Sequence, residues 1–271
     1  MRQPLERRPR GLLPCLAAIA FLNLLAGWAF LGPSSVARQG HRLQRVCVEA
    51  EAGTATLPEK DEKVIAFERD YVIDETAKLA ESTFPITPVD LIAKAKNFLA
   101  YDQGVSKPEL LADDFQFMGP VVGPLSKKGF LKAVGGFDFE SAFPDANPEW
   151  HHFRVDPFEP NRVWMTARGR GTNTGEGTNP LFKKPTGKGY VNPPQACSVT
   201  INEDGLVTQY TIGYVMDRTV GNTGGLGGIY GILYALGKPL PFREAKPWKP
   251  SLSYKMFLKM TNFLQKFQKS K

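Results

Sequence analysis

The sequence has few of the residues that usually build disulfides, metal sites and proton-transfer sites, with three cysteines and three histidines among 271 residues. Cys15, Cys47 and Cys197 are far apart and no Cys-x-x-Cys pair occurs, which argues against a disulfide framework and a structural zinc site. Asp113 and Asp114 have no partners at metal-ligand spacing, and no His-Glu-x-x-His motif or Ser-His-Asp arrangement is visible. We therefore expect no metal and no cofactor.

The main part of the chain also lacks the positive charge that a nucleic-acid-binding domain needs. The net charge of +7 comes from the two ends: residues 1–48 hold seven arginines and one glutamate, and residues 243–271 hold eight basic residues and one acidic residue. Residues 49–242 hold 19 basic and 25 acidic residues. Phosphate binding requires positive charge on the binding domain itself, so the sequence predicts no nucleic-acid partner. The hydrophobic content of 42% indicates a packed core.

Residues 1–48 have the pattern of a targeting presequence. Four arginines within residues 2–10 precede an apolar run over residues 11–30, as in a signal peptide, and residues 30–46 contain serine and arginine but no acidic residue, as in a transit peptide. This combination resembles the bipartite plastid presequences of algae with complex plastids, in which a phenylalanine follows the cleavage site, here Phe30. The resemblance implies delivery to the plastid (chloroplast). Secretion or membrane anchoring stays open, because about 20 apolar residues can span a bilayer.

The remaining chain changes from helix-like to strand-like periodicity. Apolar residues at helical spacing predict a long amphipathic helix over residues 60–82, and a second helix that ends before Gly104. A strand over 115–118 and a helix over 126–134 follow, and alternating residues then predict strands within 150–158, 163–172, 188–192, 196–202 and 206–217. Helices followed by an antiparallel meander predict an α+β fold, with helices on one face of a curved sheet.

Three segments resemble the NTF2-like, or SnoaL-like (polyketide cyclase-like), family. Residues 110–134 contain Asp-Asp-Phe, a Gly-Pro turn and a helix that opens after Leu-Ser-Lys; RGRGTNTG at 168–175 and KPTGK at 184–188 are similar to two further motifs of that family. The resemblance covers about residues 89–220 and implies a cone-shaped α+β fold around an apolar pocket. We therefore divide the chain into a presequence (1–48), an N-terminal amphipathic helix (49–85), an NTF2-like domain (86–220) and a C-terminal extension (221–271).

The resemblance also implies candidate catalytic residues. SnoaL-like cyclases are expected to carry an acid/base aspartate at the end of the last strand, which is Asp217 here; the alternative is that Asp217 caps the turn before Thr219. Tyr101 and Asp102 are placed like the Tyr-Asp pair of some dehydratase relatives, or lie at a solvated helix end. The histidine of the family's Gly-Thr motif is Asn173 here, and an asparagine cannot transfer a proton at neutral pH.

Strand alternation suggests a patch of aromatic and polar side chains. Trp150, His152 and Arg154 share one strand face, and Trp164 and Arg168 share a face of the next strand. The alternative is that this face lies on the outside of the sheet. The candidate site residues from these patterns are His152 as a further catalytic residue, and the substrate-binding residues Trp150, Trp164, Arg168, Asn173 and Tyr214.

The C-terminal extension contains a glycine-rich run, 219–242, and a basic helix. The run does not match a dinucleotide fingerprint, because its third position is Tyr230, nor a phosphate-binding loop, because Pro239 follows Lys238. We expect a tight glycine turn and a short apolar helix at the mouth of the cone. The helix after residue 250 has lysines beside an apolar face, so it could bind a membrane surface or a protein partner, or pack on its own sheet. A homodimer also stays open.

Two functions remain from the sequence alone. The favoured one is a binding or scaffold protein with a pocket for a small apolar molecule, because Asn173 replaces the family's histidine and no second acid/base residue stands out. The alternative is a cyclase, isomerase or dehydratase that uses Asp217 as general acid or base. Whether the chain is an enzyme is left open by these patterns.

Overall fold

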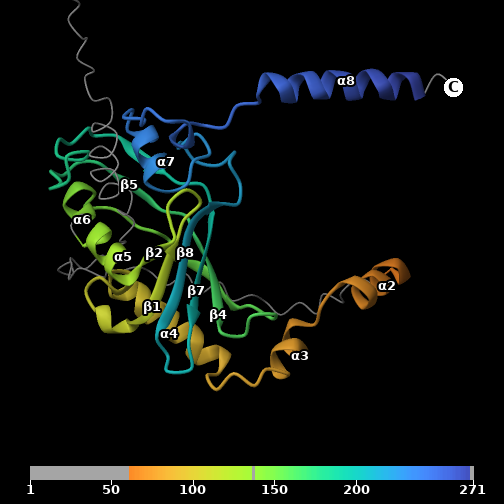
Figure 1. Cartoon of the computed structure of the whole chain (residues 1–271), viewed down its shortest axis with the longest axis horizontal. Helices are drawn as coiled ribbons and strands as arrows, with labels where there is room; N and C mark the ends of the chain where they lie inside the picture. The colour runs from red at the N-terminus through yellow and green to blue at the C-terminus, as the bar shows by residue number, and fades with distance from the viewer. Residues whose placement is uncertain (1–60, 136–137, 269–271) are drawn as a thin grey trace, which may run out of the picture.

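The computed structural model describes residues 61–135 and 138–268, with side chains described up to Thr261 in the last helix (Figure 1). The expected presequence and its candidate cleavage site therefore lie outside the described residues. The helices are α2 (Glu62–Tyr71), α3 (Glu75–Ala80), α4 (Pro88–Ala100), α5 (Lys127–Val134), α6 (Phe139–Ala142), α7 (Gly228–Ala235) and α8 (Leu252–Gln268), with three short 3-10 helices: η1 (Asp102–Gly104), η2 (Pro108–Leu110) and η3 (Arg243–Ala245).

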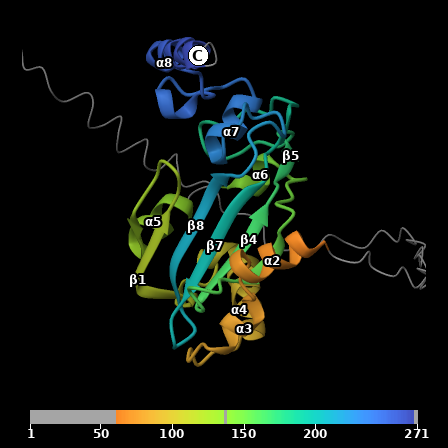
Figure 2. The ribbon, with the colours of Figure 1, turned by 90° about the vertical axis from the view of Figure 1, so that its right-hand side faces the viewer.

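The strands form a curved six-stranded sheet in the order β2-β1-β8-β7-β4-β3 (Figure 2). Their bounds are β1 Leu111–Met118, β2 Leu125–Ser126, β3 His151–Val155, β4 Arg162–Ala167, β7 Gln195–Ile201 and β8 Val207–Val215. A separate hairpin pairs β5 (Arg170–Thr172) with β6 (Gly189–Val191). All neighbours are antiparallel except β1 and β8, which run parallel. Helices followed by this curved, unclosed sheet confirm the predicted α+β, NTF2-like fold class.

Helices α4 and α5 form where the sequence predicts them, because both start with a capping side chain and bury one apolar stripe. The Thr87 hydroxyl accepts a hydrogen bond from the Asp90 backbone N–H at the start of α4, and Ser126 accepts one from Gly129 at the start of α5. Phe98 of α4 and Phe130 of α5 both contact Tyr210 of β8. The two helices therefore cover the same face of the sheet.

Aromatic side chains fill the space between these helices and the sheet. Phe98 and Tyr210 have ring centroids 5.1 Å apart, and Phe117 and Phe130 stack at 5.2 Å. All four rings are at most 5% exposed. Aromatic pairs in such arrangements contribute about 0.5–1.5 kcal/mol beyond their buried area. The interior of the cone between α4, α5 and β8 is consequently packed core, and the open space of the domain lies elsewhere.

The prediction of one long amphipathic helix over residues 60–82 is wrong in one respect: the structure has two helices there, α2 and α3. The Asp74 side chain accepts a hydrogen bond from the Ala77 backbone N–H and starts α3 as a new helix. Val72 and Ile73, with β-branched side chains, form the break. Neither α2 nor α3 has a buried residue. Among the helices that the structure describes, none is both long and apolar enough to cross a membrane.

Candidate functional site

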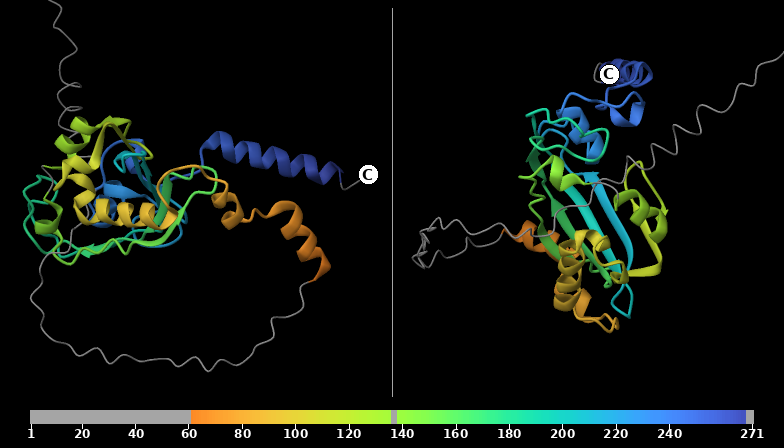
Figure 3. Two further views of the ribbon diagram at one scale, coloured as in Figure 1. Left: turned by 90° about the horizontal axis from the view of Figure 1, so that it is seen from below. Right: turned by 90° about the vertical axis from the view of Figure 1, so that its left-hand side faces the viewer.

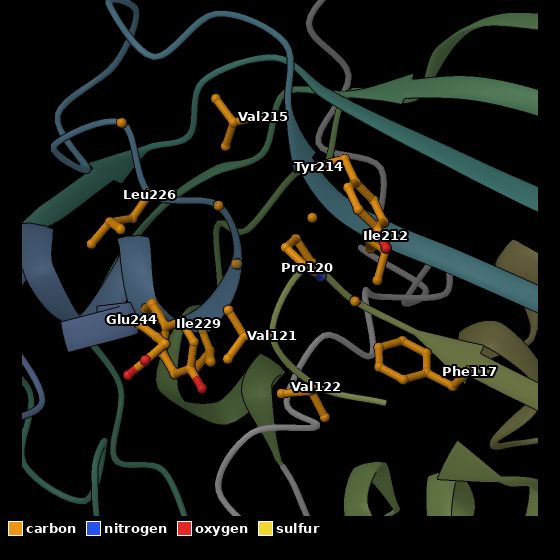
Figure 4. A pocket seen from close by; sticks show the side chains of 16 residues that line it. Phe117, Pro120, Val121, Val122, Ile212, Tyr214, Val215, Leu226, Ile229 and Glu244 are labelled. Atoms are coloured by element: carbon orange, nitrogen blue, oxygen red, sulfur yellow. The ribbon is translucent and has the colours of Figure 1, made fainter. Parts of the chain in front are cut away.

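A cavity of about 310 Å³ lies at the mouth of the cone (Figure 4). Three segments that are far apart in the sequence surround it: the β1–β2 turn, the end of β8, and the glycine-rich segment that leads into α7. Their lining residues are Phe117, Gly119, Pro120, Val121, Val122, Ile212, Gly213, Tyr214, Val215, Gly225, Leu226, Gly227, Gly228, Ile229 and Tyr230, with Glu244 from η3. The lining is therefore almost entirely apolar, as in many small-molecule sites.

The glycine-rich run forms one wall of this cavity because glycine allows its backbone to approach β8. A Cβ atom at Gly227 would lie 2.2 Å from the Gly213 carbonyl oxygen, which no side chain could tolerate. Immediately afterwards α7 begins, and it buries Ile229, Ile232 and Leu233. The expected glycine turn and short apolar helix at the cone mouth are thus confirmed. The glycines serve close backbone packing rather than phosphate binding.

Two oxygen-bearing side chains lie at one side of the cavity. Tyr230 and Glu244 both line it, and Figure 4 shows the Glu244 side chain beside Ile229. Burial, followed by the negative charge of Glu244, raises the pKa of Tyr230 to about 12. The phenol of Tyr230 is therefore protonated at neutral pH and can donate a hydrogen bond. The exposed carboxylate of Glu244 makes this side of the cavity unfavourable for an anion.

A buried amide lies beside the opposite side of the cavity, at β8. Gln195, the first residue of β7, is 0% exposed, and within the described residues neither its Oε1 nor its Nε2 atom has a hydrogen-bond partner. A Cβ atom added to Gly213 would lie 3.2 Å from Pro120 Cδ and 3.9 Å from Gln195 Oε1. Both Pro120 and Gly213 line the cavity, so the amide lies next to its floor. A buried polar group without a partner costs about 1–3 kcal/mol, which a hydrogen-bonding ligand could recover.

The structure places Asp217 in solvent, at the turn after β8. Its Oδ1 atom accepts hydrogen bonds from the Thr219 hydroxyl at 2.6 Å and from the Thr219 backbone N–H at 2.9 Å. These hydrogen bonds lower the pKa of Asp217 below its usual value. The geometry is that of a turn cap, which is the alternative considered for this residue. A desolvated carboxylate with a raised pKa, as a general acid requires, is not what Asp217 provides here.

The other catalytic candidates also lie outside the cavity lining. His152 is exposed, has φ of +55°, and its Nδ1 atom lies 3.4 Å from Thr166 Oγ1. Tyr101 is 41% exposed and its ring faces Lys107 Nζ at 5.0 Å. Asp102 accepts a hydrogen bond from the Ser106 hydroxyl at the end of α4. The structure therefore does not bring these three residues together with Asp217.

Of the predicted substrate-binding residues, one lines the cavity and the others lie elsewhere. Tyr214 lines the cavity. Trp164 instead donates from Nε1 to Asp156 at 2.7 Å and lies under the Arg162 guanidinium, on the sheet face opposite the buried Val163 and Met165. Trp150 packs at the edge of the core, and Arg168 is exposed. The outer-face alternative therefore describes Trp164 and Arg168 better than the predicted patch.

Asn173 is fully buried and ties two loops together rather than lining the cavity. Its Nδ2 atom donates to the Ala142 carbonyl oxygen at 3.1 Å, and its Oδ1 atom accepts from both the backbone N–H and the hydroxyl of Thr186 at 3.0 Å. Both ends of its amide are used. Asn173 is thus a structural residue of the β5–β6 hairpin.

Sequence reasoning missed Gln195, and it predicted the Gly119–Pro120 turn without assigning it to the site. Strand alternation places Gln195 on the same face as Cys197, Val199 and Ile201, which are buried. A glutamine at an inward-facing position of an otherwise apolar strand was the signal that could have identified it. In the part of the chain that the structure describes, no group of three or more His, Cys, Asp or Glu side chains is arranged to hold a metal ion.

Comparisons with known proteins return structures only. No family model and no curated protein matches the chain. A protein from Jannaschia sp. named as a SnoaL-like polyketide cyclase is 14% identical, with 59% of this chain and 99% of that chain covered and a TM-score of 0.40. AclR from Streptomyces galilaeus, named as a hydroxylase, is 17% identical (72% and 96% covered, TM-score 0.34), and an NTF2-like protein from Anabaena variabilis is 18% identical (50% and 95%, 0.33).

Two of these names, SnoaL-like and NTF2-like, are those of the family that the sequence motifs resemble. The identities of 14–18% and TM-scores of 0.33–0.40 are too low to carry an activity or a ligand from those proteins to this chain. The NTF2-like α+β class rests on the order of the elements and on the curved sheet described above. The function has to be argued from the site itself.

Proposed function

We propose that this protein binds a small, largely apolar molecule in the cavity at the mouth of the cone, and acts as a binding or scaffold protein. The observation that carries the proposal is the cavity of about 310 Å³, whose lining is apolar on all three of its segments. Ligand sites in proteins typically combine such a lining with a small number of placed polar groups. Tyr214, Tyr230 and Glu244 are the polar side chains of this lining, and the buried amide of Gln195 lies next to Gly213 behind it.

The polar groups define the chemistry of the ligand. The free amide of Gln195 can donate to a carbonyl oxygen or accept from a hydroxyl group. Glu244 disfavours an anionic ligand at the other side of the cavity. We therefore expect an uncharged molecule with a hydrocarbon body and one carbonyl or hydroxyl group, oriented towards Gly213 and Gln195.

The enzymatic alternative, a SnoaL-like cyclase, isomerase or dehydratase that uses Asp217, has less support. A general acid or base works best when its pKa lies near the operating pH, and the pKa of Asp217 is lowered by its turn-capping hydrogen bonds. Asn173 cannot replace a catalytic histidine, because both ends of its amide are engaged in structural hydrogen bonds. Binding is the function that these residues favour.

The test of the binding proposal is to fill the cavity. Val121 lines it and is half-exposed, so Val121→Trp places an indole ring in or across the cavity without removing a core side chain. Isothermal titration with 2-acetylnaphthalene, a neutral ketone of suitable size, should show binding to the wild type and an affinity at least about tenfold lower for this variant.

The matched control is Val89→Trp, the same substitution on the outer face of α4, where the Val89 side chain is 76% exposed. This variant should bind the ketone like the wild type. Equal binding by all three proteins, or no binding by the wild type to any neutral ketone or alcohol of this size, would contradict the proposed function.

We also propose that the protein acts in the plastid. The support is the charge and composition of residues 1–48 and the aromatic residue at the expected cleavage position, Phe30. Delivery to the secretory pathway or anchoring in a membrane is the competing interpretation of the same residues.

A further inference from the structure

Helix α8 extends away from the rest of the domain (Figures 1 and 3). Its apolar side chains are in solvent: Leu252 is 79% exposed, Met256 70% and Phe257 56%. Tyr254, Leu258 and Met260 are also exposed. Contiguous exposed apolar surface of this kind marks an interaction site on most soluble domains. The packing of this helix on its own sheet, which the sequence left open, is not what the described part of α8 shows.

The charge around α8 is of one sign. Residues 246–271 contain seven lysines and no acidic residue. Helix α2 also exposes apolar side chains, with Phe67 at 58% and Tyr71 at 78%, but its own sequence combines three acidic with two basic residues. The surface that complements α8 therefore has to be apolar and anionic at once.

The arrangement of residues along α8 matches such a surface. Leu252, Met256 and Met260 follow each other at intervals of four and form one ridge of the helix. Lys255 and Lys259 each precede a methionine by one residue, so their ridge lies about 100° around the helix from the apolar ridge. Lysines at the side of an apolar ridge can extend their ammonium groups to the level of lipid headgroups while the ridge is buried.

Contacts at the start of α8 connect it to the mouth of the cone. The ring of Trp248, 61% exposed, lies 4.6 Å from the Arg218 guanidinium and meets the ring of Tyr254 edge-on at 6.3 Å. Arg218 in turn packs on Gly225, since a Cβ atom there would lie 2.7 Å from Arg218 Cβ. Gly225 lines the cavity. Figure 2 shows α7 and α8 at the same end of the molecule, and the start of α7 lines the cavity, so the base of α8 lies at the cavity end.

We propose that α8 lies on the surface of an anionic lipid bilayer and holds the mouth of the cone next to that surface. The helix supplies apolar side chains to the acyl boundary and lysines to the headgroups, and Trp248 is placed to enter the interface beside them. This proposal does not depend on what the cavity binds.

Co-sedimentation with lipid vesicles tests the proposal. The core cluster runs from Leu91 to Ala245, so a chain that starts at Glu49 keeps all of it and lacks the apolar run at 11–30. This chain should bind vesicles that contain about 30% phosphatidylglycerol and bind pure phosphatidylcholine much more weakly. The double substitution Lys255→Glu with Lys259→Glu should lower binding to the anionic vesicles by at least about tenfold.

The matched control is Lys128→Glu with Lys132→Glu, which changes the net charge equally at the same four-residue spacing on the exposed side of α5. It should reduce binding by about threefold at most, because only general repulsion is added. Phe257→Trp provides a local readout, since the tryptophan emission that this variant gains over the wild type should shift to the blue with anionic vesicles. Equal loss in both double variants, or no blue shift in the added emission of the Phe257→Trp variant, would overturn the proposal.

Light scattering distinguishes a competing occupant, a second copy of this chain. If α8 packs between copies, the wild type is dimeric without lipid and becomes monomeric on Lys255→Glu with Lys259→Glu. That result, together with unchanged vesicle binding, would replace the membrane by a protein interface.

Discussion

At the scale of single residues, Gln195 is the most informative side chain: with Asn192, it is one of two fully buried amides that have no side-chain hydrogen-bond partner among the described residues. Gln195 is completely buried beside a cavity and leaves both ends of its amide unused there, whereas Asn173, equally buried, uses both. Folding tolerates an unpaired buried amide only at a cost in free energy. The contrast separates an asparagine that serves the fold from a glutamine that is available to a ligand.

Gln195→Leu tests this assignment, because leucine has a similar size and no hydrogen-bonding group. We expect the free energy of unfolding to stay equal or rise by about 1–2 kcal/mol, since no side-chain hydrogen bond within the described residues is lost. Affinity for 2-acetylnaphthalene should fall about tenfold, while affinity for its hydrocarbon analogue 2-isopropenylnaphthalene should not change. Urea titration and calorimetry measure the two effects.

A loss of both affinities would indicate damage to the cavity rather than loss of a hydrogen bond. If neither affinity changes while the wild type binds both probes, Gln195 does not face the ligand, although the cavity still binds it. The two probes thus separate this prediction from the proposed function.

At the scale of elements, the link between β5 and β6 depends on Asn173. The residues between these strands form no helix or strand. The Asn173 side chain donates one hydrogen bond to Ala142, outside the link, and accepts two from Thr186, at its other end. Asn173→His, which restores the residue of the family motif, should lower the free energy of unfolding by about 2–4 kcal/mol, because the ring cannot make all three bonds in the same space.

Urea unfolding followed by circular dichroism measures this change, with Asn97→His, at an exposed position of α4, as a control. A stable Asn173→His protein would show that these three hydrogen bonds are dispensable. Acquired activity on a test substrate would instead support the enzymatic alternative.

The elements were largely predictable from the sequence, and the site only in part. Local signals placed α4, α5 and α7: Thr87 and Ser126 cap the first two, and the glycine run precedes the third. The break at Asp74 was missed because a capping side chain inside an apolar pattern is easily assigned to the exposed face of one helix. The parallel pairing of β1 with β8 depends on distant residues, and no local pattern encodes it.

The site was predicted only in part. The family motif at residues 110–134 contains its β1–β2 turn, and Tyr214 and the glycine-rich run were singled out, but the catalytic candidates lie outside the cavity lining. Strand alternation placed Trp164 on the face opposite Val163 and Met165, but which face of a sheet becomes the inner one is decided by the helices that cover it. The cavity has a different origin. It results from aromatic residues that fill the interior and from glycines that allow the chain to fold over the end of β8.

At the scale of the whole molecule, the chain combines a folded domain with two ends of different chemistry. The body from residue 49 to 242 is acidic, and the two ends are basic. The N-terminal end, outside the described residues, has the sequence pattern of a targeting presequence. The C-terminal end carries α8, which the proposal above places on a lipid surface.

Plastid delivery by this presequence can be tested directly. A fluorescent protein fused after residues 1–60 should accumulate in the plastid of an alga with a complex plastid, because the serine- and arginine-rich segment becomes accessible once the signal peptide is removed. Phe30→Ala should divert most of the fusion from the plastid interior, whereas Phe21→Ala, within the apolar run, should not. Fluorescence microscopy distinguishes the two. Secretion of the unaltered fusion would refute plastid delivery.

The parallel pair of β1 and β8 has a consequence for the order in which the protein can fold. Met118 of β1 lies beside Thr211 of β8, although all the other strands of the domain come between them in the chain. Strand β8 joins β1 to the β7–β4–β3 part of the sheet, so the sheet stays in two pieces until β8 is available. Closing so long a loop slows folding. A chain that emerges from a ribosome or a translocation pore therefore cannot complete its core until almost the whole domain has passed through.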